Sequence, residues 1–231
     1  MLDVKTGYGA FMSDLARAEK LARTMVEIGN DAGVRTRALI TAMDVPLGLA
    51  VGNAIEVTES LEVLAGGGPS DLIELVIALA NEMLDVAGID ADPREAITSG
   101  RAMDHWRRMV SAQGGDPDAP LPVARHQHVI TAPVAGPFST LEAYGVGVAA
   151  WRLGAGRAHK EDEIIHGAGV QLHAKPGDML SEGQPIMTLL ADDEDRLPAA
   201  IAELEGSWEI GGEPMDRHPL VITRFDENTR G

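Results

Sequence analysis

The chain has 231 residues, no cysteine and a formal net charge of −17 from 36 acidic and 19 basic residues. The charge argues against nucleic acid or an anionic membrane surface as the main partner, because both require a concentrated basic face. The lack of cysteine excludes disulfide scaffolds, thiolate metal sites and cysteine nucleophiles. No apolar run approaches the ~20 residues of a membrane span, and the first residues lack a signal-peptide pattern, so we expect a cytoplasmic protein.

The beginning of the chain alternates strand and helix patterns. Residues 2–5 form a short apolar run, and Ser13 precedes a helix whose apolar side chains follow helical spacing from Leu15 to Ile28. Residues 36–41 form a second apolar run. A strand, a helix and a strand joined by short links predict a parallel βαβ unit.

Further helices are predicted up to residue 112. A turn at residues 44–48 leads into a helix that ends near Leu64, and Ser70 caps the next helix after a glycine-rich break. Pro93 lies at the first helical position of a capping-box arrangement, and residues 102–112 also have a helical pattern.

Glycine, proline and aspartate dominate residues 114–122, where we place a linker. Residues 1–113 are therefore expected to form an α/β domain with a partial mixed or parallel sheet, and residues 123–231 a smaller α+β domain. The predicted elements of the second domain are strands at 127–132, 136–141, 164–172 and 185–190 and helices at 145–153 and 198–205.

One segment of the second domain, residues 175–186, has the glycine and proline rhythm of biotinyl and lipoyl carrier domains. This rhythm predicts a hammerhead-like arrangement of strands. Such carriers also need a modifiable lysine in a later turn, and residues 188–192 contain none. A swinging-arm carrier is therefore excluded.

The turn around Leu47 is the first candidate site. Pro46 and Gly48 bracket Leu47, which should leave carbonyl oxygens unpaired, and Glu59 lies on the helix that follows. Carbonyl oxygens and one carboxylate suit a hard, oxygen-seeking cation. Spacing alone favours the simpler alternative of an ordinary turn followed by a surface glutamate.

The other polar clusters indicate less. Seven histidines without an HExxH motif or a cysteine argue against zinc. The acidic run at 192–195 could suggest calcium, but it fits better as the acidic approach to a helix near Pro198. The glycines at 7 and 9 follow a strand, where open α/β sheets bind ligands, but Met12 replaces the third glycine of a dinucleotide fingerprint.

Read together, several motifs resemble those of thymidine and pyrimidine-nucleoside phosphorylases. They are DVKTGYGAFM at 3–12, MDVPLG at 43–48 with VGNAIEV at 51–57, MVSAQGG at 109–115, and LGAGR at 153–157 with KED at 160–162. The motifs keep the family's order and spread over nearly the whole chain. They resemble only the C-terminal portion of a family member.

The resemblance implies reversible phosphorolysis, in which a pyrimidine nucleoside and inorganic phosphate give the free base and a (deoxy)ribose 1-phosphate. It implies a homodimer that uses no organic cofactor and binds a potassium ion. Phe11 matches the family's aromatic residue that lines the base pocket. Leu47 and Ala50 match residues that offer backbone carbonyls to potassium, and Glu59 matches the one that offers a carboxylate.

Other family motifs have no match in this sequence. These are the phosphate-binding Lys-His-Ser segment, the SGRG signature, and the catalytic Arg and Ser-Lys-Lys stretch, all of which lie upstream of the DVK segment in the family. We therefore assign no catalytic residue here, expect much of the dimer interface to be missing, and expect this chain alone to be inactive. The alternatives are a non-catalytic binding or regulatory module, or a nucleoside-monophosphate phosphorylase, for which no basic cluster is evident.

Overall fold

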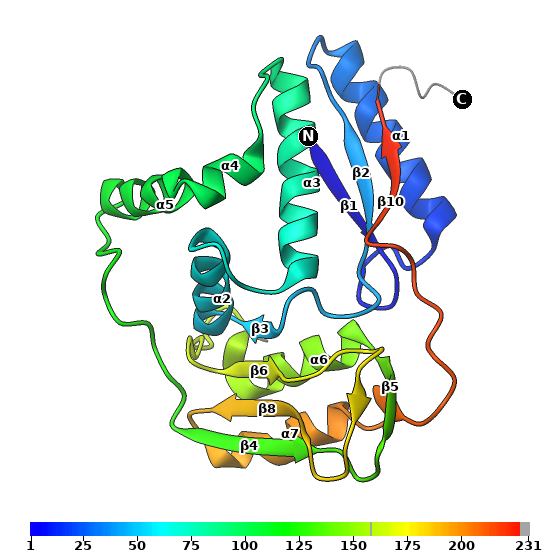
Figure 1. The fold of residues 1–231 in the computed structure, drawn as a ribbon, viewed down its shortest axis with the longest axis vertical. Helices are drawn as coiled ribbons and strands as arrows, with labels where there is room; N and C mark the ends of the chain where they lie inside the picture. The colour runs from blue at the N-terminus through cyan, green and yellow to red at the C-terminus, as the bar shows by residue number, and fades with distance from the viewer. Residues whose placement is uncertain (158, 227–231) are drawn as a thin grey trace.

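The computed structural model describes residues 1–157 and 159–226, which form an upper and a lower part along the longest axis (Figure 1). The upper part contains a three-stranded sheet in the order β1-β2-β10. Its strands are β1 (Leu2–Thr6), β2 (Ala38–Ala42) and β10 (Val221–Phe225). β1 and β2 are parallel, as the predicted βαβ unit requires, and β10 is antiparallel to β2.

Helix α1 (Leu15–Asp31) covers one face of this sheet, where Ala18, Ala22 and Val26 are buried. Its cap differs from the prediction. Asp14, not Ser13, is the N-cap residue, because its carboxylate accepts a hydrogen bond of 2.9 Å from the backbone N–H of Arg17. The helix therefore begins one residue later than the sequence suggested.

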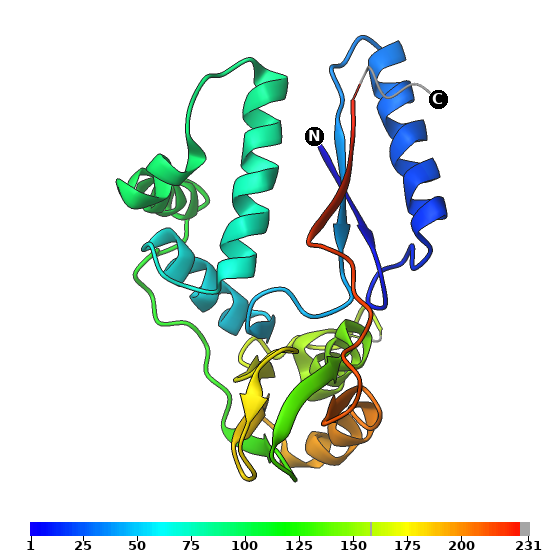
Figure 2. The ribbon, with the colours of Figure 1, turned by 45° about the vertical axis from the view of Figure 1, so that its right-hand side comes forward.

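The predicted helices after β2 are all present. They are α2 (Ala54–Leu64), α3 (Ser70–Ala87), α4 (Pro93–Thr98) and α5 (Arg101–Ala112). Figure 2 shows α3 on the side of the sheet opposite α1. Glu82 of α3 forms ion pairs with Arg37, next to β2, and with Arg224 of β10. None of the helices in the described part of the chain combines the length and apolar composition that a membrane crossing requires.

The lower part is the α+β unit. One sheet has the order β3-β6-β8-β4 with antiparallel neighbours, and a second has the order β7-β5-β9. Their strands are β3 (Ala50–Gly52), β4 (His126–Thr131), β5 (Gly136–Leu141), β6 (Gly169–Leu172), β7 (Met179–Leu180), β8 (Pro185–Ala191) and β9 (Trp208–Ile210). Helix α6 (Ala143–Ala150), a π-helical turn (Trp151–Ala155), a 3₁₀ turn (Glu194–Arg196) and α7 (Leu197–Glu203) complete the unit.

The core of the lower part is mostly aliphatic, because only 3% of the residues in the chain are aromatic. Phe138, Leu141, Leu153 and Met187 are among its fully buried side chains. The strand predicted at 164–172 is shorter than expected and spans only β6. The backbone just before β6 does not extend the strand. The carbonyl of His166 accepts a hydrogen bond from the N–H of Ala54, at the start of α2.

The two parts exchange strands. β3 leaves the first half of the chain to pair with β6, and β10 returns from the end of the chain to pair with β2. Phe225 of β10 is buried in the same apolar cluster as Val4 and Ile40. The domain boundary at 114–122 stays a prediction. Each of the two parts contains one strand from the other side of this segment.

Candidate functional site

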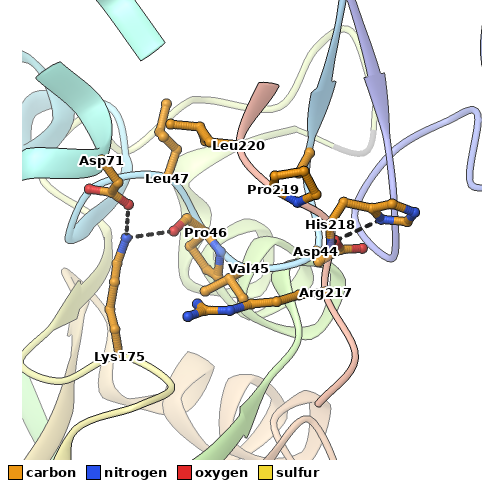
Figure 3. A pocket seen from close by; sticks show the side chains of 11 residues that line it. Asp44, Val45, Pro46, Leu47, Asp71, Lys175, Arg217, His218, Pro219 and Leu220 are labelled. Atoms are coloured by element: carbon orange, nitrogen blue, oxygen red, sulfur yellow. Dashed lines mark hydrogen bonds and ion pairs between the residues drawn. The ribbon is translucent and has the colours of Figure 1, made fainter. Parts of the chain in front are cut away.

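The segment that crosses from β2 to β3 carries the candidate cation turn. It lines a cavity of about 270 Å³ together with the first turn of α3, the β6–β7 loop and the segment before β10 (Figure 3). Gly48 in this turn has a φ of 66°, a left-handed conformation that glycine adopts at little cost. The turn therefore depends on Gly48.

Glu59 projects from α2 against this turn. The side chain is buried, with 8% of the residue exposed, so the interpretation as a surface glutamate is wrong. Its Oε1 accepts a hydrogen bond of 2.7 Å from the N–H of Leu49. A side chain at position 48 would overlap Oε2, so Gly48 is also required to let the carboxylate approach the backbone.

The carboxyl group of Glu59 has a raised pKa. Burial, which penalises the charged form, is the largest cause, and the charge of Asp71 adds to it. Hydrogen bonds from the backbone of Leu49 and Ala50 and the charge of Lys175 act in the opposite direction. A bound cation beside this carboxylate would favour its charged form.

The carbonyl of Ala50 points away from its neighbouring strand. Leu172 donates its N–H to the carbonyl of Leu49 at 2.7 Å, and Ala50 is opposite Gln171 in the register. In an antiparallel ladder, the residue after a hydrogen-bonded one directs its N–H and carbonyl to the other side. β3 is an edge strand, so the Ala50 carbonyl faces its free edge.

The carbonyl of Leu47 is the third oxygen of the predicted set. Among the described residues, no donor forms a hydrogen bond with it. The structure thus brings Leu47, Ala50 and Glu59 to one turn. The same residues 1–157 and 159–226 contain no group of three His, Asp or Glu side chains that could hold a metal, so oxygen ligands at this turn would have to come mainly from the backbone.

Two charged residues that the sequence did not assign to a site also contact this turn. Asp71, in the first turn of α3, accepts a hydrogen bond of 3.3 Å from the N–H of Gly48. Lys175, from the β6–β7 loop, forms an ion pair with Asp71 and donates a hydrogen bond of 2.9 Å to the carbonyl of Pro46 (Figure 3). The only feature of the sequence that singled out Lys175 is its position at the start of the carrier-like segment 175–186, and no feature singled out Asp71.

Phe11 lies on a different loop, between β1 and α1. Phe11 is 98% exposed, which is unusual for an aromatic side chain in a chain with only 3% aromatic residues. The loop backbone is nevertheless held in place. Gly9 donates its N–H to the carbonyl of Met43 at 2.8 Å, and Tyr8 donates to a carboxylate oxygen of Asp44 at 3.2 Å.

Asp44 links the Phe11 loop to the rest of the molecule. The residue is only 3% exposed. Its Oδ2 accepts hydrogen bonds from the backbone N–H of His218 at 2.9 Å and lies 3.0 Å from Nδ1 of the same histidine. Its carbonyl accepts from the N–H of Ala143 at the start of α6. One buried residue therefore holds both parts of the molecule, with its carboxylate bound to the Phe11 loop and to the segment before β10, and its backbone carbonyl bound to α6.

The remaining polar clusters have structural contacts. Within the acidic run, Asp193 is the N-cap residue of the 3₁₀ turn that precedes α7, which agrees with its interpretation as a helix approach. Nδ1 of His126 lies 2.9 Å from a carboxylate oxygen of Glu194, and His173 contacts the hydroxyl of Thr188.

The fold and this turn define a class of protein, an α/β unit joined to an α+β unit with a buried carboxylate and backbone carbonyls where the chain crosses between them. Comparison with known proteins narrows the class. Residues 138–211 match the pyrimidine nucleoside phosphorylase C-terminal domain. The chain is 50% identical over 226 residues to a thymidine phosphorylase of Mycobacterium tuberculosis, covering 97% of this chain and 53% of that protein.

It is also 42% identical over 236 residues to a pyrimidine-nucleoside phosphorylase of Bacillus subtilis, covering 96% of this chain and 54% of that protein. A Staphylococcus aureus protein of the same description gives the same identity over 237 residues. The chain spans about half the length of these curated relatives. Residues 138–211 therefore form a pyrimidine nucleoside phosphorylase C-terminal domain, and the chain as a whole corresponds to a C-terminal portion of the thymidine and pyrimidine-nucleoside phosphorylases that it matches.

Proposed function

We propose that this chain forms the C-terminal portion of a cytoplasmic, homodimeric pyrimidine-nucleoside phosphorylase. The reaction is reversible transfer of the pentose from a pyrimidine base to inorganic phosphate, a glycosyl transfer without an organic cofactor. The identity of 50% to a thymidine phosphorylase over 97% of the chain is the observation that carries this proposal.

Phe11 is the candidate wall of the base pocket. Its ring is exposed, whereas the backbone of its loop is hydrogen-bonded. The ring is therefore accessible to a base on a loop whose backbone is held in place. A flat base stacked on it would remove apolar surface from water and lose little conformational freedom, because the loop is already ordered.

The activity is tested by thymidine and uridine phosphorolysis. We expect the purified 231-residue chain alone to give no turnover, because the family's phosphate and base-carbonyl motifs do not occur in it. Adding the N-terminal half of the Mycobacterium tuberculosis relative should restore turnover. Robust turnover by the chain alone would contradict the expected inactivity. Nucleoside binding without turnover in the mixture would favour the non-catalytic module.

In the restored mixture, Phe11→Ala should raise the KM for thymidine about tenfold, because stacking of one base on an aromatic ring contributes about 1–3 kcal/mol. The matched control is Tyr8→Ala, which removes another exposed aromatic side chain from the same loop. Equal effects of the two substitutions on the KM would contradict the assignment of Phe11 to the base pocket.

Potassium is the proposed ion for the Leu47, Ala50 and Glu59 site. The donor set fits it, since two backbone carbonyls without partners from neighbouring strands and one buried carboxylate suit a hard cation of low charge. The ion would supply a fixed positive charge at the crossing between the two parts.

Potassium should raise the thermal stability of the chain. A cation in hundredfold excess over its Kd adds about 2.7 kcal/mol to the free energy of unfolding, and Glu59→Gln should abolish this gain. Without potassium, the same variant should be at least as stable as the wild type at pH 7. A raised carboxyl pKa means that the folded state disfavours the charge, so stability falls as pH rises past 4.5.

The measurement is a thermal melt in potassium chloride against choline chloride at equal ionic strength. Glu62→Gln, an exposed glutamate on the same helix, is the matched control and should keep the potassium response. A response that survives in Glu59→Gln would disprove the assigned ligand.

A further inference from the structure

Three charged side chains from different elements meet at the candidate cation turn. Glu59 of α2 and Asp71 of α3 accept hydrogen bonds from the N–H groups of Leu49 and Gly48, which are adjacent residues. Lys175 reaches the turn from the lower part of the molecule and pairs with Asp71. Figure 3 shows the ammonium group between Asp71 and the carbonyl of Pro46.

The charges at the turn leave one carboxylate without a cationic partner. Lys175 neutralises Asp71, and Glu59 forms no ion pair with any other described residue. The side chains of Lys175 and Asp71 are 21% and 34% exposed, so water screens their interaction only in part. Both charges affect the carboxyl group of Glu59, in opposite directions, which agrees with their proximity.

Lys175 also limits the number of oxygen ligands. Its ammonium group occupies the carbonyl of Pro46 and a carboxylate oxygen of Asp71. Calcium requires six to eight oxygens and is favoured by several carboxylates, whereas a monovalent ion is satisfied by carbonyls and one charge. Without Lys175, the turn would offer two carboxylates and another carbonyl.

We infer that Lys175 determines the specificity of this site for a monovalent cation, by neutralising Asp71 and leaving Glu59 as the single unpaired carboxylate. The inference rests on the proposed cation site. It differs from a purely positioning role, because the charge on Lys175, and not only its hydrogen bonds, sets which ion is bound.

The test is a series of variants that changes the charge at the turn in single steps. Potassium and calcium affinities are measured for each from the dependence of the melting temperature on chloride salts at constant ionic strength. Lys175→Met removes one positive charge and should tighten potassium binding about tenfold and calcium binding about a hundredfold, because the interaction energy scales with the charge of the ion. The calcium-to-potassium preference therefore rises about tenfold.

Asp71→Asn changes the charge in the other direction and should weaken potassium about tenfold and calcium about a hundredfold. The double variant Lys175→Met with Asp71→Asn has the original charge and should return both affinities to near the wild-type values. Lys20→Met, an exposed lysine on α1, is the control and should change neither. Far-ultraviolet circular dichroism checks that each variant is folded.

The outcomes separate the two proposals. If the wild-type chain shows no potassium response, the cation site and the role of Lys175 both fail. If the wild type responds but Lys175→Met keeps the wild-type preference, or binds both ions more weakly, only the specificity role fails. If Lys175→Met does not fold, Asp71→Asn tests the specificity role by itself, and unchanged potassium and calcium affinities in that variant would contradict the role.

Discussion

Replacing Phe138 with alanine is expected to lower the free energy of unfolding by about 3–5 kcal/mol. Phe138 lies on β5 and is 1% exposed, among the largest fully buried side chains of the lower core. Most of the other side chains in this core are aliphatic, and such a core cannot fill the space that a ring leaves without moving backbone. Urea denaturation monitored by circular dichroism measures the loss.

Phe11→Ala is the matched control, because the two substitutions remove the same atoms. Phe11 is 98% exposed, so its loss should change the free energy of unfolding by less than about 0.5 kcal/mol. The comparison separates a phenylalanine kept for packing from one that contributes nothing to stability. Similar losses for both variants would mean that Phe11 packs in a way the structure does not show.

Asp44→Ala is the second substitution with a large expected effect, a loss of about 3 kcal/mol. It leaves two backbone N–H groups, of Tyr8 and His218, without their acceptor, and each unsatisfied buried donor costs about 1–3 kcal/mol. Hydrogen exchange should also become faster at these two amides, since the carboxylate holds both segments.

Asp44→Asn is expected to cost about half as much, because the amide oxygen still accepts one of the hydrogen bonds. Glu182→Ala, an exposed acidic residue in a turn of the lower part, should leave stability and exchange at Tyr8 unchanged. Faster exchange at Tyr8 in both Asp44→Ala and Glu182→Ala would point to general loosening and not to the loss of this carboxylate.

The helices of this chain could be predicted well because helical spacing is a local property. The apolar residues of α1 and α3 repeat within one segment, so no knowledge of their neighbours was needed. β3 and β10 were not predicted. β3 has only three residues, and both strands are defined by partners far away in the sequence, β6 and β2.

The candidate site divides in the same way. Leu47, Ala50 and Glu59 lie within a short stretch, so a turn, a helix and a motif resemblance were enough to select them. Asp71 and Lys175 could not be selected, because they are more than 100 positions apart and meet only through packing of the two parts.

The sequence by itself determined the helices, the change from an α/β to an α+β pattern and the phosphorylase motifs, since each depends on residues close together in the chain. Only the tertiary structure decided that Glu59 is buried, that Asp44 joins the Phe11 loop to the segment before β10, and that Lys175 pairs with Asp71 at the candidate cation turn. The physical reason is that burial and charge pairing depend on which distant segments pack together, and the spacing of residues within one segment does not determine this packing.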